Sequence, residues 1–510
     1  LDWAAMGLPP GVKEYEYSRL EKHGGQGGFK PWSELEDLFY LYQERLAPCR
    51  IMSDEAFLTF INQYKSISCK MLAINETLAK LIASDKIQIR AAGCRDFNLK
   101  KTDPIAQRRA IQDYKSGLAE NFFMYVFSRY NKLKPRIFMP GPFSSMLDQA
   151  RYIHPFLTAI QDDIKLKRSE SKLVQHADKL GFGPCFDIMG EEINKLNLDF
   201  RSWTPLYVQG DFEKMDTTEG PSQYENLFIP AIAAAFNFGR NSENYKQLSK
   251  SMMKTVKMPI ASPSGMMVGD HGTGSGMDNT NIGEGCSNDY YEIRWIGNLK
   301  QLCEKKNIQI KIGPRRVNGD DSHVIIFVKS KDPAIIALVK KLIQQCAEQA
   351  ANECGFRINS KWRIDEHFGL FCQNIFWYDY RKKRIIWFYP ASLIINAIMN
   401  PEGEYLSPFK TKTIDGKKIK YLNPDVKKHP EKPWWDKDYR DIDVTEKLDN
   451  GKNLPYFTQL IDFVDNGMKY RLLGKSEKET SRILSKYERY RALQPYDKYF
   501  NRLDYDFSKS

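Results

Sequence analysis

The sequence predicts an α+β fold that is built from several subdomains. The chain has 510 residues, whereas a single hydrophobic core stops growing near about 250–300 residues. Long stretches with apolar residues at helical spacing alternate with strand-like runs that are joined by turn residues. We therefore expect roughly three subdomains, with antiparallel strands flanked by helices and mostly helical regions on either side.

The composition is that of a packed chain with an excess of positive charge. Hydrophobic residues make up 42% and charged residues 27% of it, which excludes wholesale disorder, collagen and a bare coiled coil. The 76 Lys and Arg residues outnumber the 64 Asp and Glu residues, and the net charge is +12. This excess favours a polyanionic partner without identifying one.

The cysteine pattern and the hydropathy of the chain indicate its expected redox environment and its relation to membranes. None of the nine cysteines forms a C-x-x-C pair, so we expect neither a disulfide framework nor a zinc ribbon, and a reducing environment. The longest nearly apolar stretch, Ile385 to Met399, contains Pro390 and Asn396 and is shorter than the roughly 18–20 residues that a membrane span needs. The residues after Leu1 lack the basic and apolar regions of a signal peptide. We expect no membrane span and no secretion.

The first third of the chain is predicted to be helical after a polar start. Gly24 to Gly28 is a flexible loop by composition. From Ser33 to about Tyr130, apolar residues recur mostly at intervals of three and four residues, which predicts helices. Three prolines and several basic residues then break the pattern between Asn131 and Pro142, so this segment is predicted to be an extended basic strand or loop.

The middle of the chain contains a strand that ends in an acid and a glycine-rich segment that opens a helix. Trp203 to Phe212 is aromatic and β-branched and carries Asp211 at its end. Helical stretches follow to about Lys257, and Ser262 to Gly276 is rich in Gly and Ser. A long helix is then predicted as far as Lys305.

A hairpin and a well-capped helix follow. The apolar runs Ile308 to Ile312 and Val324 to Val328 flank Asn318-Gly319-Asp320-Asp321, and an Asn-Gly pair between two strands is a strong hairpin signal. Asp332 as N-cap, Pro333 in the first turn and Gly355 just past the end delimit the next helix.

The last third is predicted to start with a second hairpin and to end in helix. Phe371 to Trp377 and Ile385 to Tyr389 are its strands. Asn400 to Pro455 is an irregular segment rich in Pro and Lys that includes Trp434-Trp435. Irregular segments of this length are unusual and tend to be functional. Glu477 to Leu493 returns to helical spacing.

Three carboxylates are positioned to hold divalent metal ions. Asp211 ends a strand, and Asp320 with its neighbour Asp321 lies in a hairpin turn. Clustered carboxylates repel one another without a cation and become stable ligands with Mg²⁺. Two such ions promote phosphoryl transfer. Taken alone, Gly319-Asp320-Asp321 is ordinary turn chemistry, so the assignment depends on its context.

Three further segments supply that context. Asp216 follows Asp211 closely and either faces a nucleotide ribose or caps a helix. Ser275-Gly276, before Thr280, offers backbone N–H groups and hydroxyls to a ribose or phosphate, or forms an N-cap only. Lys134-Pro135-Arg136 suits a triphosphate, or is a solvated basic loop.

Together, in this order and with 109 residues from Asp211 to Asp320, these segments resemble the viral RNA-dependent RNA polymerases. The amino-acid sequence around Asp211 and from Gly272 to Asp278 is similar to that of the picobirnavirus polymerases, which belong to bisegmented double-stranded RNA viruses. The matching segments are Lys134 with Arg136 (motif F), Asp211 to Asp216 (motif A), Ser275-Gly276 with Thr280 (motif B) and Asn318 to Ser322 (motif C). The helix from Asp332 and the Phe371 to Tyr389 hairpin fall where motifs D and E would stand.

The resemblance implies a right-hand fold of fingers, palm and thumb with an antiparallel palm sheet. Residues 1–200 would form the N-terminal region and fingers. Residues 201–370 would form the palm, with a fingers insertion at about 220–270. Residues 371–510 would form the motif E hairpin and the thumb, with the irregular segment at about 400–455. This segment would be either a thumb-surface loop that packs two Trp side chains or an element that projects into the template or product channel.

The resemblance also implies roles for individual residues. Asp211 and Asp320 would bind Mg²⁺, or Mn²⁺, with help from Asp321, and Lys361 would be a general acid for pyrophosphate departure. The nucleotide would be held by Lys134, Arg136, Asp216, Ser275, Gly276 and Thr280. Asp216 would recognise the ribose 2′-OH.

One departure concerns the partner of Asp216. Many relatives carry an Asn four residues after the motif B Thr, where this chain has Glu284. A second carboxylate opposite Asp216 would repel it. Asn281 is our preferred substitute, and Asn288 is the alternative.

Other functions fit the sequence less well. A reverse transcriptase usually has a bulky residue at the ribose position, where this chain has Asp216. A helicase P-loop needs a Gly where Lys469 stands before Gly474-Lys475-Ser476. A basic RNA-binding or coat protein would leave the aspartates unexplained. The implied partners are RNA template and product, ribonucleoside triphosphates and the capsid protein, and the implied location is the virion interior and the host cytoplasm.

Overall fold

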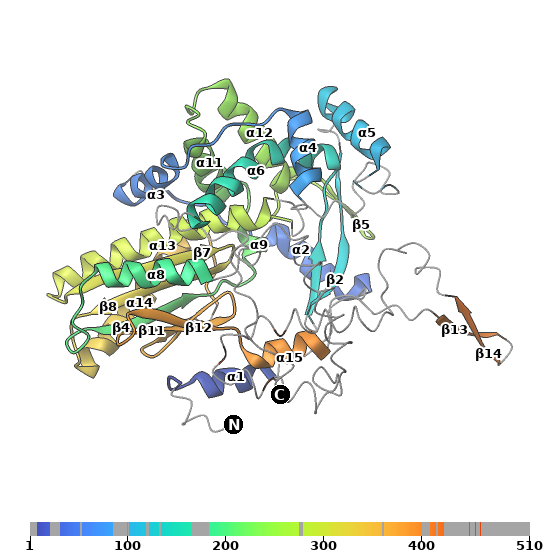
Figure 1. The fold of residues 1–510 in the computed structure, drawn as a ribbon. Helices are drawn as coiled ribbons and strands as arrows, with labels where there is room; N and C mark the ends of the chain where they lie inside the picture. The colour runs from blue at the N-terminus through green and yellow to red at the C-terminus, as the bar shows by residue number, and fades with distance from the viewer. Residues whose placement is uncertain are drawn as a thin grey trace.

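The computed structural model describes residues 8–20, 31–51, 54–84, 99, 101, 103–118, 122–131, 134–165, 183–274, 279–359, 362–399, 409–414, 417–422, 448, 454 and 460. A central antiparallel sheet is covered by helices on one face and by a second sheet on the other (Figure 1). A further group of helices lies above one end of this sheet (Figure 1). In the described part of the chain, no helix is both long enough and apolar enough to cross a bilayer.

The central sheet has the strand order β7-β8-β4-β9, and every pair in it is antiparallel. Its strands are β4 (Thr204–Gly210), β7 (Ile310–Asn318), β8 (Asp321–Val328) and β9 (Arg363–Asp365). The predicted strand before Asp211 and the hairpin around Asn318-Gly319 are confirmed. The first strand of that hairpin extends further than expected, to Asn318 itself.

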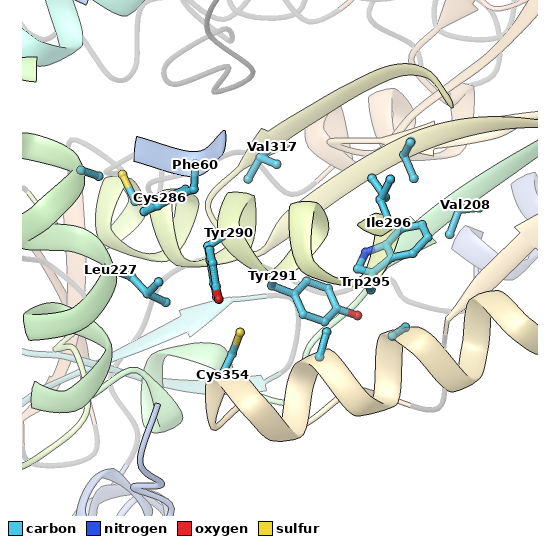
Figure 2. Close-up of a cluster of buried hydrophobic side chains, with 14 of the residues drawn as sticks. Phe60, Val208, Leu227, Cys286, Tyr290, Tyr291, Trp295, Ile296, Val317 and Cys354 are labelled. Carbon is cyan, nitrogen blue, oxygen red and sulfur yellow. The ribbon is translucent and has the colours of Figure 1, made fainter. Parts of the chain in front are cut away.

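One face of the sheet packs against α13 (Thr280–Lys305) and α14 (Pro333–Cys354). Figure 2 shows Val208 of β4 beside Trp295 and Ile296 of α13, with Tyr291 closer to Cys354 at the end of α14. All five side chains are buried or nearly so. The predicted long helix to Lys305 and the predicted helix after Asp332 are both confirmed, because each carries the apolar stripe that covers this face.

The opposite face packs against a second sheet and α8 (Gly183–Lys195). Tyr207 of β4 and His323 of β8 both contact the ring of Phe376, with centroid distances of 5.9 and 4.5 Å. Burial lowers the pKa of His323 to about 3, so its ring is neutral. Because both faces are covered, β8 is an almost uninterrupted apolar run.

Two consecutive arginines of β7 show the alternation of the strand. Arg315 points toward α13 and pairs with the buried carboxylates Asp289 and Glu292. Arg316 points to the other face and pairs with Glu192 of α8 at 3.0 Å. Successive side chains of a strand face opposite sides, so each arginine meets the helix that covers its own side.

The second sheet has the order β10-β11-β12 and corrects one prediction. Its strands are β10 (Gly369–Phe371), β11 (Asn374–Asp379) and β12 (Arg384–Phe388). The predicted strand from Phe371 to Trp377 is wrong at its start, because Cys372 and Gln373 have φ angles of 47° and 66° and form a turn. The Asn374 amide donates to the carbonyls of Phe371 and Cys372 and stabilises this turn.

The helices above and beside the sheet bring together segments that are distant in sequence (Figure 1). They are α2 (Glu36–Glu44), α3 (Glu55–Lys65), α4 (Ile74–Ser84), α5 (Pro104–Lys115), α6 (Phe143–Lys165), α9 (Met215–Thr218), α10 (Pro221–Gln223), the π-helical η3 (Tyr224–Phe228), α11 (Ile229–Ala235) and α12 (Glu243–Lys257), with the 3-10 turn η1 (Trp32–Glu34) before them. Helix was expected in most of these positions. The long helix α6 contains Pro155 in its interior, well past its first turn.

The helical prediction that extends to Tyr130 is wrong over its last residues, which are strands. β1 (Met124–Tyr125) pairs with β5 (Ile260–Ser262), which also pairs with β6 (Gly265–Met267). β2 (Phe127–Asn131) pairs with β3 (Lys134–Phe138), which confirms the predicted extended basic segment. Periodicity misses β1 because its strand partner lies more than a hundred residues away.

The remaining elements come from the start of the chain and from its last third. α1 (Val12–Leu20) packs beside α15 (Ala391–Met399) below the second sheet (Figure 1). The segment Asn400 to Pro455, predicted to be irregular, contains the hairpin of β13 (Phe409–Ile414) and β14 (Lys417–Leu422). The predicted Gly24 to Gly28 loop, Trp434-Trp435 and the Glu477 to Leu493 helix lie outside the described residues.

Candidate active site

Asp211 lies directly after β4, beside the turn that carries Asp320 and Asp321. Gly210 pairs with Ser322 of β8, so the next residue of the antiparallel ladder, Asp211, comes opposite the start of β8. A Cβ atom at Gly210 would be only 2.9 Å from the Ser322 Oγ atom. Glycine therefore leaves room for the Ser322 hydroxyl where the acids meet, and a larger residue would displace it.

The turn between β7 and β8 is held by two asparagines of α13. Gly319 has a φ of +61°, a conformation that glycine adopts without strain. The Asn288 amide donates to the Gly319 carbonyl at 3.0 Å and to the Asp320 carbonyl at 3.3 Å. The Asn281 side chain lies against Gly319, since a Cβ there would come within 3.1 Å of its Nδ2 atom.

The three carboxylates are close enough to repel one another. Burial, followed by the charges of Asp320 and Asp211, raises the pKa of Asp321 to about 7, while the nearby Arg19 lowers it. Like charges that share a site favour the protonated form of one of them. The structure therefore brings together the three aspartates that the sequence singled out as metal ligands.

The donor set suits Mg²⁺ in its chemistry. Carboxylate oxygens are the hard ligands that this ion takes, and a bound cation would relieve the repulsion around Asp321. Among the described residues, no three His, Cys, Asp or Glu side chains are already grouped at the spacing of metal ligands. Asp211 and the Asp320 turn come from separate elements, so the two must adjust around an ion.

A short segment after α14 fixes Asp211. The Asn359 N–H donates to the Asp211 carbonyl at 2.9 Å, and its side-chain amide donates to Asp211 Oδ2 at 3.2 Å. Phe212 forms a bridge with Ile358, and the Glu213 N–H donates to the Arg357 carbonyl at 2.9 Å. This segment therefore extends the sheet edge past the end of β4 and sets the direction of the acid.

Asp216 lies in the first turn of α9 and is bonded from the N-terminal part of the chain. The Tyr42 hydroxyl of α2 donates to Asp216 Oδ2 at 2.7 Å. Tyr42 is only 2% exposed, so the phenol is held in place by packing. The nearby Arg45 pairs with Glu213 at 2.9 Å, and α2 thus contacts both ends of the segment that follows Asp211.

The predicted partners of Asp216 take different positions. Asn288, our alternative, is fully buried and its amide donates to the turn carbonyls as described, so its pairing with Asp216 stays a prediction. Asn281, our preferred choice, is exposed beside Gly319. Glu284 is buried, and its charge contributes to the raised pKa of Tyr224.

Thr280 and the buried Glu219 position the start of α13. The Thr280 hydroxyl donates to the Gly274 carbonyl at 2.8 Å. Glu219 accepts hydrogen bonds from Ser287 of α13 at 2.6 Å and from Thr273 at 3.2 Å. Burial raises the pKa of Glu219 to about 8. These bonds tie α9, the residue 271–274 loop and α13 into one unit.

Several predicted site residues are described incompletely or not at all. Lys134 and Arg136 lie on β3, where Arg136 pairs with Arg129 in register. Ser275, Gly276 and Lys361 lie outside the described residues.

Sequence patterns did not indicate that Tyr42, Asn359 and Glu219 belong to the site. Tyr42 occupies an apolar position of a helix, and nothing in such a pattern separates a core tyrosine from one that donates to Asp216. Asn359 follows α14 by a few residues and resembles any loop asparagine. Only the crossing of distant segments reveals these contacts.

Comparison with known proteins supports the fold. The searches of protein-family models and of curated proteins found no match. The crystal structure of the RNA-dependent RNA polymerase of a human picobirnavirus is similar, with a TM-score of 0.65 and 14% identity over 95% of this chain and 82% of that chain. An insertion loop deletion mutant of such a polymerase gives a TM-score of 0.61 at 14% identity, over 95% and 84% of the two chains. At this identity the likeness shows the fold, and the chain has the right-hand polymerase fold that its motifs predicted.

Proposed function

We propose that this chain is an RNA-directed RNA polymerase that copies an RNA template from ribonucleoside triphosphates. The observation that carries the proposal is the meeting of Asp211 with Asp320 and Asp321 at the ends of the two central strands of an antiparallel sheet. Asp211 is adjacent to the other two only in the folded chain, in the fold that is shared with the picobirnavirus polymerase. A coat or RNA-binding protein has no need for three mutually repelling carboxylates at such a point.

Mg²⁺ or Mn²⁺, when bound, would activate the attacking 3′ hydroxyl and neutralise charge on the phosphates. Asp211 and Asp320 would hold the ions, with Asp321 assisting. Asn359 and Asn288 orient these acids through the bonds described above. Lys361 would protonate the departing pyrophosphate.

The remaining predicted residues would bind the nucleotide. Asp216 would accept a hydrogen bond from the 2′-OH, which distinguishes a ribonucleotide from its deoxy analogue. The presence of an acid there also favours this proposal over a reverse transcriptase. The other proposed nucleotide-binding residues are Lys134, Arg136, Ser275, Gly276, Thr280 and Asn281.

The wider setting forms part of the same proposal. Residues 1–200 would be the N-terminal region and fingers, 201–370 the palm, and 371–510 the motif E hairpin and thumb. The partners would be template and product RNA and the capsid protein, and the enzyme would act in the virion interior and the host cytoplasm. The excess of basic residues suits RNA binding.

Synthesis on a single-stranded RNA template with four ribonucleotides and Mg²⁺ or Mn²⁺ tests the proposal. Wild type should make a full-length product, and Asp320→Asn or Asp211→Asn should lower synthesis by at least about 100-fold, because each removes a charged ligand of the ions. Asp270→Asn, at an exposed aspartate, is the matched control and should retain activity.

Two outcomes would contradict parts of the proposal. Equal incorporation of deoxynucleotides by wild type would overturn the assignment to RNA synthesis. RNA binding without incorporation of any nucleotide would favour an RNA-binding protein.

A further inference from the structure

The helix α2 connects the two segments that flank the proposed nucleotide site. The Gly272 N–H donates to the Tyr42 carbonyl at 2.6 Å, while the Tyr42 hydroxyl donates to Asp216. The next residue, Gln43, donates to the Val268 carbonyl at 3.0 Å. A single residue, Tyr42, therefore links the loop before α13 to Asp216 of α9.

The position of Tyr42 leaves little freedom to the bond with Asp216. Tyr42 is buried in a cluster with Leu35, Phe39 and Met139. A tyrosine side chain has few rotatable bonds, so packing of its ring fixes its hydroxyl. Gly272 also lies close to α9: a Cβ atom there would be 2.5 Å from the Asp216 carbonyl oxygen and 2.9 Å from the Thr217 backbone.

We propose that Tyr42 is a specificity-determining positioning residue that orients the Asp216 carboxylate toward the 2′-OH of the incoming nucleotide. This inference rests on the proposed function. A hydrogen bond from a hydroxyl group to a carboxylate is shorter and stronger than one between two neutral groups. With Oδ2 bonded to Tyr42, the carboxylate has one preferred rotation, and the direction of its remaining acceptor capacity is set before the nucleotide binds.

The physical consequence concerns discrimination more than rate. A site built to accept a hydrogen bond from a substrate hydroxyl rejects the analogue that lacks it, because its own polar group is then left unpaired. A carboxylate that rotates freely pairs with water or another donor instead, and the penalty against the deoxy analogue shrinks. Loss of the Tyr42 hydroxyl should therefore raise the relative use of 2′-deoxynucleotides.

The test compares three nucleotides in single-nucleotide extension by wild type and Tyr42→Phe. We measure kcat/KM for CTP, 2′-deoxy-CTP and 3′-deoxy-CTP. The ratio of CTP to 2′-deoxy-CTP should fall by about tenfold, which is about 1.4 kcal/mol, while the ratio of CTP to 3′-deoxy-CTP stays as in wild type. Both ratios are formed within one preparation, so an inactive fraction cancels.

Two controls separate this effect from a general structural one. Tyr40→Phe changes an exposed tyrosine of the same helix, which is 40% exposed, and should leave both ratios unchanged. In an Asp216→Asn background, adding Tyr42→Phe should change the 2′-deoxy ratio little, because the two residues act through one contact. Tyr42→Met removes the same hydroxyl with a flexible side chain and is the second variant should Tyr42→Phe not fold.

The outcomes distinguish this inference from the proposed function. An unchanged 2′-deoxy ratio in a folded, active Tyr42 variant, or an equal change in both ratios, would overturn the role of Tyr42 alone. Absence of any product from wild type would overturn the proposed function, and this inference with it.

Discussion

Glu219 is a fully buried carboxyl group beside the proposed nucleotide site. It accepts hydrogen bonds from Ser287 and Thr273, and the ring of Tyr224 lies nearby across Gly283. Burial raises its pKa to about 8 from an ordinary value of 4.5. At neutral pH the group is therefore largely protonated, and it joins three segments without bringing a second negative charge close to Asp216.

This shift predicts a dependence of stability on pH. Between pH 4.5 and about 8 the unfolded chain loses the Glu219 proton while the folded chain keeps it. The stabilisation is fully present below pH 4.5 and is lost as the pH rises through 8, at up to about 1.4 kcal/mol per pH unit. Glu219→Gln removes this pH-dependent loss of stability. The melting temperature of the variant, relative to that of wild type, should therefore increase as the pH rises from 5 to 8.

Thermal melts at several pH values, with Glu225→Gln as an exposed control, check this prediction. A difference between Glu219→Gln and wild type that stays constant from pH 5 to 8 would show that the folded chain ionises Glu219 as readily as the unfolded one.

The two ends of α14 are stabilised by different physical means. At the start, the Asp332 side chain accepts from the Ala334 N–H at 2.8 Å. At the end, Gly355 has a φ of +77°. A Cβ atom there would be 2.6 Å from Gln223 Nε2 and 2.8 Å from the Ala47 carbonyl oxygen.

Substitutions at the two ends should therefore differ in size. Asp332→Ala removes a cap and should cost about 1 kcal/mol. Gly355→Ala should cost more, because the left-handed conformation alone costs about 1–2 kcal/mol and the new methyl group meets backbone. Only Gly355→Ala should also slow synthesis, since the segment it leads into holds Asp211.

Melting temperatures and extension rates of both variants measure these effects. An equal loss of stability at the two ends, or normal synthesis by Gly355→Ala, would contradict this account of how α14 is joined to the site.

At the scale of the whole molecule, α1 connects the start of the chain to its last third. Glu16 is 4% exposed and accepts hydrogen bonds from the Ala391 N–H at 2.9 Å and from the Ser392 N–H at 3.2 Å. The Ser392 hydroxyl also donates to it, at 2.7 Å. These donors belong to the first turn of α15, so Glu16 caps a helix that begins 375 residues later in the chain.

Removal of this cap should loosen α15 locally. Glu16→Ala leaves buried N–H groups without their acceptor, at a cost of about 1–3 kcal/mol. Hydrogen exchange at the first turn of α15 should become at least about tenfold faster. Glu14→Ala, at an exposed glutamate of the same helix, is the control and should leave the exchange rates as in wild type. Unchanged exchange in Glu16→Ala would show that other contacts hold α1 to α15.

Local signals predicted those elements whose stability is decided within a few residues. The Asn318-Gly319 turn, the caps of α14 and the strand before Asp211 all form as expected. The same signals failed where distant pairing decides, as in β1, whose partner β5 is remote in sequence. They also missed the turn at Cys372 and Gln373, where the backbone of two non-glycine residues adopts positive φ.

Local signals revealed the aspartates of the site, whereas the residues that orient them depend on contacts between distant segments. Asp211, Asp320 and Asp321 were identified from a strand end and a turn, Asp216 from its place after Asp211, and all four from the order of the motifs. Their neighbours were not, because Asn359 is 148 residues from Asp211, and Tyr42 is 174 residues from Asp216. A hydrogen bond between such residues depends on how whole elements pack, and no short-range pattern encodes it. Motif order along the chain therefore predicts which groups carry the proposed chemistry, whereas the packing of distant elements sets which side chains position them.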